Sequence, residues 1–194
     1  MVKDFCKDEV IQDDTVQEEP VVDEAVQEEM NEDIVMDNEI VNDEIIIKES
    51  TLDDVIKVHR QIPEFELESL ENDEDLRAYF ENRYKDKEKI IIVGYLNDEP
   101  IGYIIGYDKF SDGESFYCWM AGVAEQWRRI GTLTGLMYYQ KAWAKKHGYS
   151  TLKIKTRNTR REMLAFLVKD GFNFTSVDAR DEIENNRINL QIDL

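Results

Sequence analysis

Residues that build covalent or metal-stabilised scaffolds are scarce in this sequence. It contains two cysteines, Cys6 and Cys118, and two histidines, His59 and His147, among 194 residues. The cysteines lie in unrelated contexts, so a disulfide framework is not supported and a reducing compartment is the simpler interpretation. Because the four side chains show no zinc-ligand spacing, the sequence predicts no metal site.

Long hydrophobic runs are also absent. No stretch of about 18 apolar residues is present, so no membrane-spanning helix is predicted. The first ten residues, MVKDFCKDEV, lack the apolar centre of a signal peptide. Together with the cysteine usage, these absences predict a cytoplasmic protein.

Basic residues are in the minority. The chain has 24 Lys and Arg against 43 Asp and Glu, a formal net charge of -19. A nucleic-acid binder needs a basic face that releases counterions from phosphates, and an acidic membrane leaflet would repel this chain, so neither partner is predicted. The charge favours a cationic partner or substrate.

Acidic side chains are concentrated near the N-terminus. Residues 1–44 hold 17 Asp and Glu and 2 Lys, a net of -15, whereas the other 150 residues have a net of -4. The apolar residues of the first segment are sparse and mostly β-branched, too few to offset the entropy of ordering it. We therefore predict a mostly disordered acidic leader over 1–43, with a short helix over 22–34 as the alternative, and one folded domain over 44–194.

The folded part shows alternating strand and helix patterns. Strands are expected around 44–50, 89–96, 101–107, 115–123, 151–156, 172–177 and 187–193, and helices after Ser50, over 73–84, from Gly131 to His147 and over 158–170. Turns at 97–100 and 111–114 join three strands into an antiparallel meander. This order predicts an α+β fold whose mixed, mostly antiparallel central sheet is flanked by helices.

The segment WMAGVAEQWRRIGTLTGLM (119–137) combines a strand end, two arginines and a glycine at the start of a helix. A helix N-terminus has free N–H groups and positive partial charge, and Gly131 would let the backbone approach a phosphate. Arg128 or Arg129 can add charge, and Thr132 and Thr134 offer hydroxyls. The alternative is an ordinary strand–turn–helix with a glycine near the cap.

Residues from about 45 to 194 resemble the GCN5-related N-acetyltransferase (GNAT) family. Its central motif runs V-x-P-x-x-R-G-x-G-x-G, then small residues and a pair of leucines, and this chain matches it at Val123, Arg128, Gly131, Leu136 and Met137. The stretches AWAKKHGY, LKIKTRN and KDGF and the opening IIIKESTLDD also look like the family, in the family's order. The resemblance implies the GNAT acyl-CoA N-acyltransferase fold.

The resemblance also implies acetyl-CoA as co-substrate. In such proteins the turn that maps to residues 128–134 holds the pyrophosphate through main-chain N–H groups. The preceding strand end pairs with the pantetheine arm and polarises the thioester carbonyl, and Asn158 stands where the family often has an asparagine that contacts this arm. The residues implied in donor binding are Ala121, Gly122, Val123, Arg128, Arg129, Ile130, Gly131, Thr132, Leu133, Thr134 and Asn158.

Three departures from the family pattern bear on activity. Leu133 stands at the motif's second glycine position, so its side chain must point into the core or crowd the phosphate. Glu125 stands where the family often has proline. The family's usual tyrosine acid is absent, because its position falls on Ala165 or Leu167.

An amine acceptor has to lose a proton, since a lysine-type ammonium has a pKa near ~10.4. The catalytic candidates are Glu125 as the base and Tyr138 and Tyr117 as proton donors to the leaving thiolate. Each also has a simpler interpretation as a surface carboxylate or a packing aromatic. Further carboxylates considered as bases are Glu64, Glu66, Glu68 and Glu114.

Three other side chains complete the candidate list. Trp119 is the aromatic residue most suited to line an acceptor pocket. Cys118 is interpreted as a small buried apolar residue, because no histidine lies near it in sequence. His59 is interpreted as a helix-surface residue.

The resulting hypothesis is an enzyme that transfers acetyl from acetyl-CoA to a primary amine by direct attack in a ternary complex. The acceptor is a small molecule or a protein, and the net charge favours a cationic one. The alternative, motivated by Leu133 and the missing tyrosine, is a non-catalytic GNAT-fold module that binds acyl-CoA or a protein partner. A third hypothesis has the acidic leader capture a basic partner that the domain acetylates; monomer and homodimer both remain open.

Overall fold

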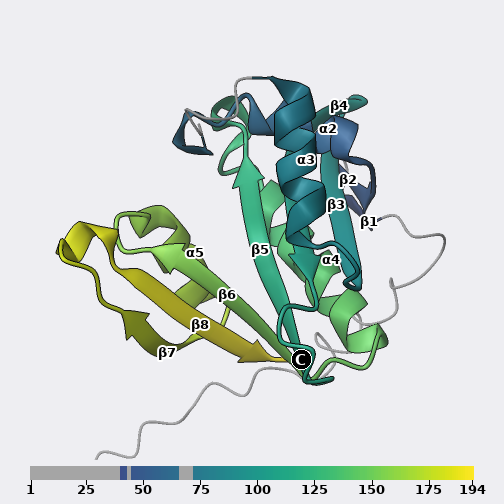
Figure 1. The fold of residues 1–194 in the computed structure, drawn as a ribbon. Helices are drawn as coiled ribbons and strands as arrows, with labels where there is room; N and C mark the ends of the chain where they lie inside the picture. The colour runs from purple at the N-terminus through teal and green to yellow at the C-terminus, as the bar shows by residue number, and fades with distance from the viewer. Residues whose placement is uncertain (1–39, 43–44, 66–71) are drawn as a thin grey trace, which may run out of the picture. The chain divides into compact units, whose positions relative to one another are not determined.

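A mixed sheet of eight strands forms the centre of the fold (Figure 1). The computed structural model describes residues 40–42, 45–65 and 72–194. The strands are β1 (Ile40–Asn42), β2 (Ile45–Glu49), β3 (Lys89–Leu96), β4 (Glu99–Tyr107), β5 (Ser115–Val123), β6 (Thr151–Arg157), β7 (Asn173–Asp178) and β8 (Arg187–Asp193). Their order across the sheet is β1-β2-β3-β4-β5-β6-β8-β7, with β5 and β6 parallel and the other neighbours antiparallel.

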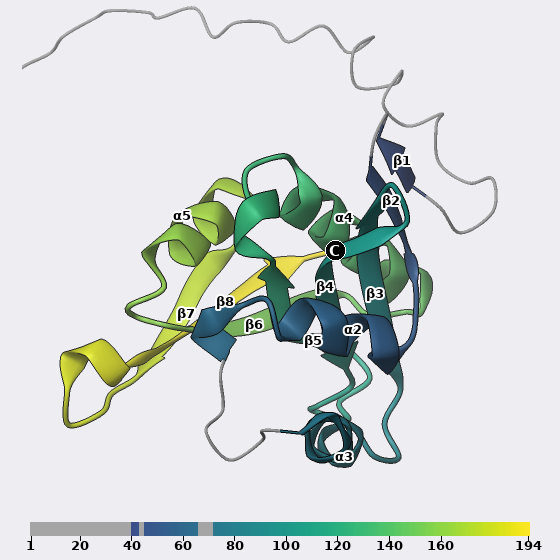
Figure 2. The same ribbon diagram turned by 90° about the horizontal axis from the view of Figure 1, so that it is seen from above.

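Helices flank this sheet on both sides (Figure 2). Those of the described residues are α2 (Leu52–His59) and α3 (Asp73–Arg83) on one side and α4 (Thr132–Lys146) and α5 (Arg161–Lys169) on the other. Three short 3-10 turns connect the elements: η1 (Pro63–Phe65), η2 (Glu125–Trp127) and η3 (Ile183–Asn185). The predicted α+β fold with a mixed, mostly antiparallel sheet is confirmed.

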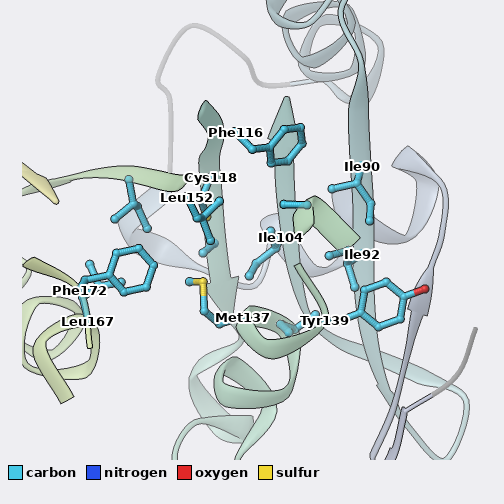
Figure 3. Close-up of a cluster of buried hydrophobic side chains, with 14 of the residues drawn as sticks. Ile90, Ile92, Ile104, Phe116, Cys118, Met137, Tyr139, Leu152, Leu167 and Phe172 are labelled. Atoms are coloured by element: carbon cyan, nitrogen blue, oxygen red, sulfur yellow. The ribbon is translucent and has the colours of Figure 1, made fainter. Parts of the chain in front are cut away.

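The sheet separates two hydrophobic clusters. On the side of α4 and α5, strand residues such as Ile104 and Phe116 pack with Met137 (Figure 3). On the side of α2 and α3, Ile105 packs with residues that include Phe80. Successive strand residues point to opposite faces of the sheet, so the strands of the meander contribute side chains to both clusters. Because both faces are buried, these strands are almost continuously apolar.

Strands β5 and β6 separate partway along their length. The first four residues of each strand pair in register, and the pairing stops at Cys118 and Ile154. On its other edge β5 has a bulge that leaves Trp119 without a partner in β4. Bulges bend a strand, and the far parts of β5 and β6 diverge (Figure 1). We call the space between residues 119–123 and 155–157 the splay.

The first turn of α4 lies very close to the sheet, at positions where the strands have glycine. A Cβ added at Gly102 would lie 2.9 Å from Cγ2 of Thr132, and one added at Gly94 would lie 3.1 Å from the same atom. A larger residue at either position would therefore push the start of α4 away from β3 and β4. The two glycines thus fix where the helix begins relative to the splay.

Two elements differ from the sequence predictions. Helix α5 begins at Arg161 instead of residue 158, because turn hydrogen bonds from Arg160 N to Arg157 O and from Arg161 N to Thr159 O occupy the preceding backbone. Strand β1 lies within the predicted leader and pairs antiparallel with β2. The rest of the predicted leader, and its alternative helix over 22–34, lie outside the described residues.

Candidate functional site

The chain between β5 and α4 forms a tight turn. Arg129 and Gly131 both adopt left-handed backbone conformations, with φ of 68° and 95°. Gly131 is the N-cap of α4, and a hydrogen bond of 3.0 Å from Gly135 N to Gly131 O starts the helix. Glycine takes this conformation without steric penalty, whereas in Arg129 the backbone carries a strain of about 1–2 kcal/mol.

The N-terminus of α4 presents free main-chain donors. Gly135 donates the first hydrogen bond of α4. The main-chain N–H groups of the three residues before it, Thr132, Leu133 and Thr134, therefore have no acceptor within the helix. No other backbone hydrogen bond of the described residues uses them. The Leu133 side chain packs against the cluster under α4 and α5, so it does not cover the helix end. The predicted anion site is thus open, at the positive end of the helix dipole.

The edge of β5 that faces the splay also carries free main-chain groups. Ala124 N donates to Ile101 O in β4 at 3.0 Å, so strand alternation directs the groups of Ala121 and Val123 away from β4. The Val123 carbonyl accepts from Arg128 Nε at 3.1 Å. The Val123 N–H and both groups of Ala121 are left to pair with an extended partner inside the splay.

Gly122 faces a different neighbour. A Cβ added there would lie 2.5 Å from Cε2 of Phe65 and 2.7 Å from Cδ1 of Ile62. Only glycine therefore lets η1 pack directly on the end of β5. This contact closes the splay on the α2 side next to its open end.

Glu64 of η1 joins two arginines across that open end. It accepts from Arg128 Nη2 at Oε2 (2.9 Å) and from Arg160 Nη2 at its main-chain oxygen (2.6 Å). Hydrogen bonding by Arg128 is the main cause that holds the pKa of Glu64 below its ordinary value. A carboxylate with a lowered pKa is a weak base, which makes Glu64 a poor candidate for the catalytic base. Its hydrogen bonds instead link η1 to the loop after β5 and to the loop after β6.

Of the other polar residues of the implied donor site, Arg129 and Asn158 have partners of their own, whereas Oγ1 of Thr132 is buried without a hydrogen bond to any described residue. Arg129 is 84% exposed and its Nη2 lies 2.9 Å from Oε1 of Glu162 in α5. The side-chain amide of Asn158 donates to Ile183 O at 3.1 Å, which ties the end of β6 to η3. Its side-chain oxygen is left as the group with which Asn158 could contact a ligand.

The three catalytic candidates lie in different places. Glu125 is exposed and begins η2, two residues after β5 ends at the open end of the splay. Tyr138 is 42% exposed, on the side of α4 that faces away from the sheet. Tyr117 lies where β5 still pairs with β6, under Lys109 Nζ at 4.3 Å from its ring centroid, and burial raises its pKa well above the ordinary value.

The other candidates are placed as follows. Glu114 directly precedes β5, at the end of the strand opposite the splay opening. Glu66 and Glu68 lie outside the described residues. Trp119 is the first residue of β5 in the splay; its ring is partly buried beside Phe80 on the α3 side, with the Arg83 guanidinium 5.5 Å from its centroid, and its role in an acceptor pocket stays a prediction.

His59 is buried, and its interpretation as a helix-surface residue was wrong. Its side chain is 5% exposed, and Nδ1 lies 2.7 Å from the Tyr103 hydroxyl. Its ring stacks on Phe65 at 5.5 Å and meets the edge of Phe80 at 5.3 Å. The sequence did carry the relevant pattern, because His59 follows Val55 by four residues and so shares the buried face of α2.

The His59 environment predicts a pH dependence of stability. Burial, with a smaller contribution from Arg60, lowers the pKa of His59 from 6.5 to about 4. The folded state then prefers the neutral ring. The contribution of His59 to the unfolding free energy is therefore fully present above pH 6.5 and is progressively lost as the pH falls toward 4. Between pH 7 and pH 5 we expect the wild type to lose about 2 kcal/mol of unfolding free energy that a His59→Gln variant does not lose. Urea unfolding at both pH values measures this, and an identical pH dependence in the two proteins would contradict it.

Cys118 is predicted to be chemically inert in the folded protein. Burial raises its pKa to about 12, against a smaller opposing effect of the Gln140 side chain. In a Cys6→Ser variant, which leaves Cys118 as the remaining thiol, we expect less than about 5% reaction with an aromatic disulfide reagent before unfolding and one equivalent after it. Rapid labelling of the native variant would show that the thiol is accessible.

Other features of the described residues lie apart from the splay. A hollow of about 490 Å³ is lined by α2, α3, β3 and the turn before β3, and none of its residues belongs to β5, β6 or α4. No cluster of three or more His, Cys, Asp or Glu side chains in the described ranges could hold a metal ion. None of the described helices is long and apolar enough to cross a membrane.

The diverging strands β5 and β6 lie beside the unpaired N-terminus of α4. This arrangement is that of the acyl-CoA N-acyltransferase fold, the fold predicted from the sequence. The model of the Acetyltransferase (GNAT) family matches residues 55–172, more than half of the chain. The chain therefore belongs to this family. No curated protein matches it.

Solved structures are similar in fold. Ard1 from Thermoplasma volcanium is 18% identical, covers 77% of this chain and 97% of its own, and superposes with a TM-score of 0.62. An acetyltransferase from Thermus thermophilus is 15% identical, with 78% and 97% covered and a TM-score of 0.62. A GNAT family acetyltransferase from Elizabethkingia anophelis, solved with acetyl-CoA bound, is 23% identical, with 79% and 100% covered and a TM-score of 0.56.

Proposed function

We propose that this protein transfers an acetyl group from acetyl-CoA to a primary amine by direct attack in a ternary complex. The observation that carries the proposal is the unpaired N-terminus of α4 beside the splay, where main-chain donors and a free strand edge meet. Membership of an acetyltransferase family supports it, as does the structural neighbour solved with acetyl-CoA.

The residues present fit this donor. The N–H groups of Thr132–Thr134 would hold the diphosphate, and the free edge at Ala121 and Val123 would pair with the extended arm. The departure at Leu133 is compatible with this, because the side chain packs into the core cluster. Bound in this way, acetyl-CoA supplies an activated acetyl thioester.

Proton transfer is the second requirement. The amine nitrogen bonds to the acetyl carbon as the C–S bond breaks, the amine loses one proton, and the thiolate gains one. We propose that Glu125, exposed at the open end of the splay, takes the amine proton through water. Tyr117 and Tyr138 remain the candidate donors to the thiolate, although the raised pKa of Tyr117 makes it a weak acid.

Calorimetry with acetyl-CoA and a thiol-release assay over an amine panel test the proposal together. Saturable binding and sustained, amine-dependent thiol release are expected. No binding at millimolar acetyl-CoA would reject the donor. Binding without release for any amine would instead support the non-catalytic module.

A Glu125→Gln variant tests the base. We expect kcat to fall at least about tenfold, because general-base assistance is lost, while the affinity for acetyl-CoA stays unchanged. Glu114→Gln, at the opposite end of β5, is the matched control and should keep wild-type kcat. Equal activity of the two variants would remove Glu125 from the mechanism.

A further inference from the structure

One face of the C-terminal half of the sheet carries no helix among the described elements. Helix α5 packs on the opposite face, where Ile154 and Leu190 join Leu167 in the cluster of Figure 3 (compare Figure 2). The cluster under α2 and α3 contains no residue of β6, β7 or β8. We call the side of β6 and β8 that faces away from α5 the uncovered face.

Strand register places cations on this face. Lys153 pairs with Tyr117, which belongs to the α2 and α3 side, so alternation puts Lys155 and Arg157 on the uncovered face as well. The β6–β8 register then sets Arg157 directly opposite Arg187. Like charges directly opposite each other on neighbouring strands destabilise a sheet. An anion between the two guanidiniums would remove this repulsion.

Within the described residues, neither guanidinium has an acidic side chain as partner. Nη1 of Arg187 is buried without a hydrogen bond, and burial followed by repulsion from Arg157 lowers the pKa of Arg187. Asp178 is the cross-strand neighbour of Arg187 in β7. Its carboxylate, however, binds Lys155 at 2.7 Å and the Asn189 side chain at 2.9 Å.

The arginine pair lies beside the proposed reaction site. Arg157 is the last residue of β6, on the part of the strand that has left β5, and it directly precedes Asn158. Residues 128–134, which we call the donor loop, lead into α4 on one side of the sheet, whereas the uncovered face and Trp119 are on the other. An acceptor that approaches the splay from the side opposite the donor loop would therefore meet these two arginines.

We propose that Arg157 and Arg187 bind an oxyanion of the acceptor, a carboxylate or a phosphoryl group, so that the substrates are amines that also carry negative charge. This inference rests on the proposed acetyltransferase function. Two guanidiniums offer planar pairs of N–H donors that match an oxyanion in bidentate fashion. The net charge of -19 favours a cationic acceptor, whereas the local charges favour one that is zwitterionic.

Matched amines test the inference in the thiol-release assay. Amino acids from glycine to 6-aminohexanoate are each compared with the alkylamine that lacks the carboxylate, and phosphoethanolamine is compared with ethanolamine. We expect kcat/KM to be at least about tenfold higher for the anionic member at the best spacing, since hydrogen bonds to charged groups are strong. A preference for the uncharged member in every pair would overturn the inference and leave the transferase function intact.

Variants separate the arginine pair from general electrostatics. Arg157→Gln and Arg187→Gln should each reduce the anionic advantage to under about threefold, without change in the kcat/KM of the neutral amine or in acetyl-CoA affinity. Arg161→Gln, which removes the same charge from an exposed position of α5 on the opposite face of the sheet, should retain most of the advantage. An advantage that survives in both Arg157 and Arg187 variants would overturn the assignment.

A separate binding measurement distinguishes a failure of this inference from a failure of the proposed function. If acetyl-CoA binds but no amine releases thiol, the transferase proposal fails. The anion site is then decided by calorimetry in the presence of CoA, with N-acetyl-6-aminohexanoate and N-acetylpentylamine. Tighter binding of the carboxylate that is lost in Arg187→Gln supports the site, and equal binding overturns it.

Discussion

A Gly131→Val variant is expected to lose at least about thirtyfold in affinity for acetyl-CoA. Gly131 has φ of 95° and ψ of -9° as the N-cap of α4. A β-branched residue strains this left-handed backbone by at least about 1–2 kcal/mol, so the turn has to rearrange. Rearrangement misaligns the N–H groups of Thr132–Thr134, and losing one charge-assisted hydrogen bond costs about 1.5–3 kcal/mol. Isothermal calorimetry measures the affinity directly.

Helix α4 offers a matched control at its other end. Gly148 also has positive φ, 89°, and a Cβ there would meet nothing within 4 Å. Gly148→Val should therefore lower stability by a similar amount, about 1–2 kcal/mol, and leave acetyl-CoA affinity unchanged. If both variants weaken binding equally, the effect belongs to the stability of α4 and the turn is not the anion site.

The sequence predicted the long helices and every strand except β1, because the patterns that indicate these elements are local. The meander shows an apolar run broken by turn residues, and Gly148 marks the end of α4 as expected of a left-handed C-cap. The start of α5 was predicted three residues early. Its limit is set by turn hydrogen bonds near Thr159, which helix propensity does not reveal.

The candidate site was predictable only in part, for the same reason. The loop from Arg128 to Thr134 is contiguous, so its motif and its helix-end donors could be identified together. Glu64 meets Arg128 from 64 residues away, and Arg157 faces Arg187 only because of the β6–β8 register. Neither pairing leaves a spacing pattern in the sequence, since each depends on how distant elements pack.

The packing of α3 behind Trp119 is another such long-range feature. Phe80 is fully buried and contacts the ring of Trp119 at 5.7 Å and that of His59 at 5.3 Å. It therefore joins α3 to α2 and to the bulged part of β5. Because Trp119 lines the start of the splay, this side chain connects core packing with the shape of the acceptor side.

A Phe80→Ala variant is accordingly expected to lose about 3–5 kcal/mol of unfolding free energy, as large-to-small changes of a fully buried aromatic do. Denaturant unfolding measures the loss. Tyr79→Ala is the neighbouring control, because Tyr79 contacts Trp119 at 5.8 Å but is 40% exposed, and it should lose about 1 kcal/mol or less.

In the Phe80→Ala protein that stays folded, Trp119 loses its contact with the Phe80 ring, and we expect the KM for the amine to rise. The affinity for acetyl-CoA should be retained, because the donor loop lies on the other side of the sheet. Similar stability losses for the two variants would show that α3 is not anchored through Phe80. A weakened acetyl-CoA affinity with an unchanged KM would show that Trp119 does not line the acceptor side.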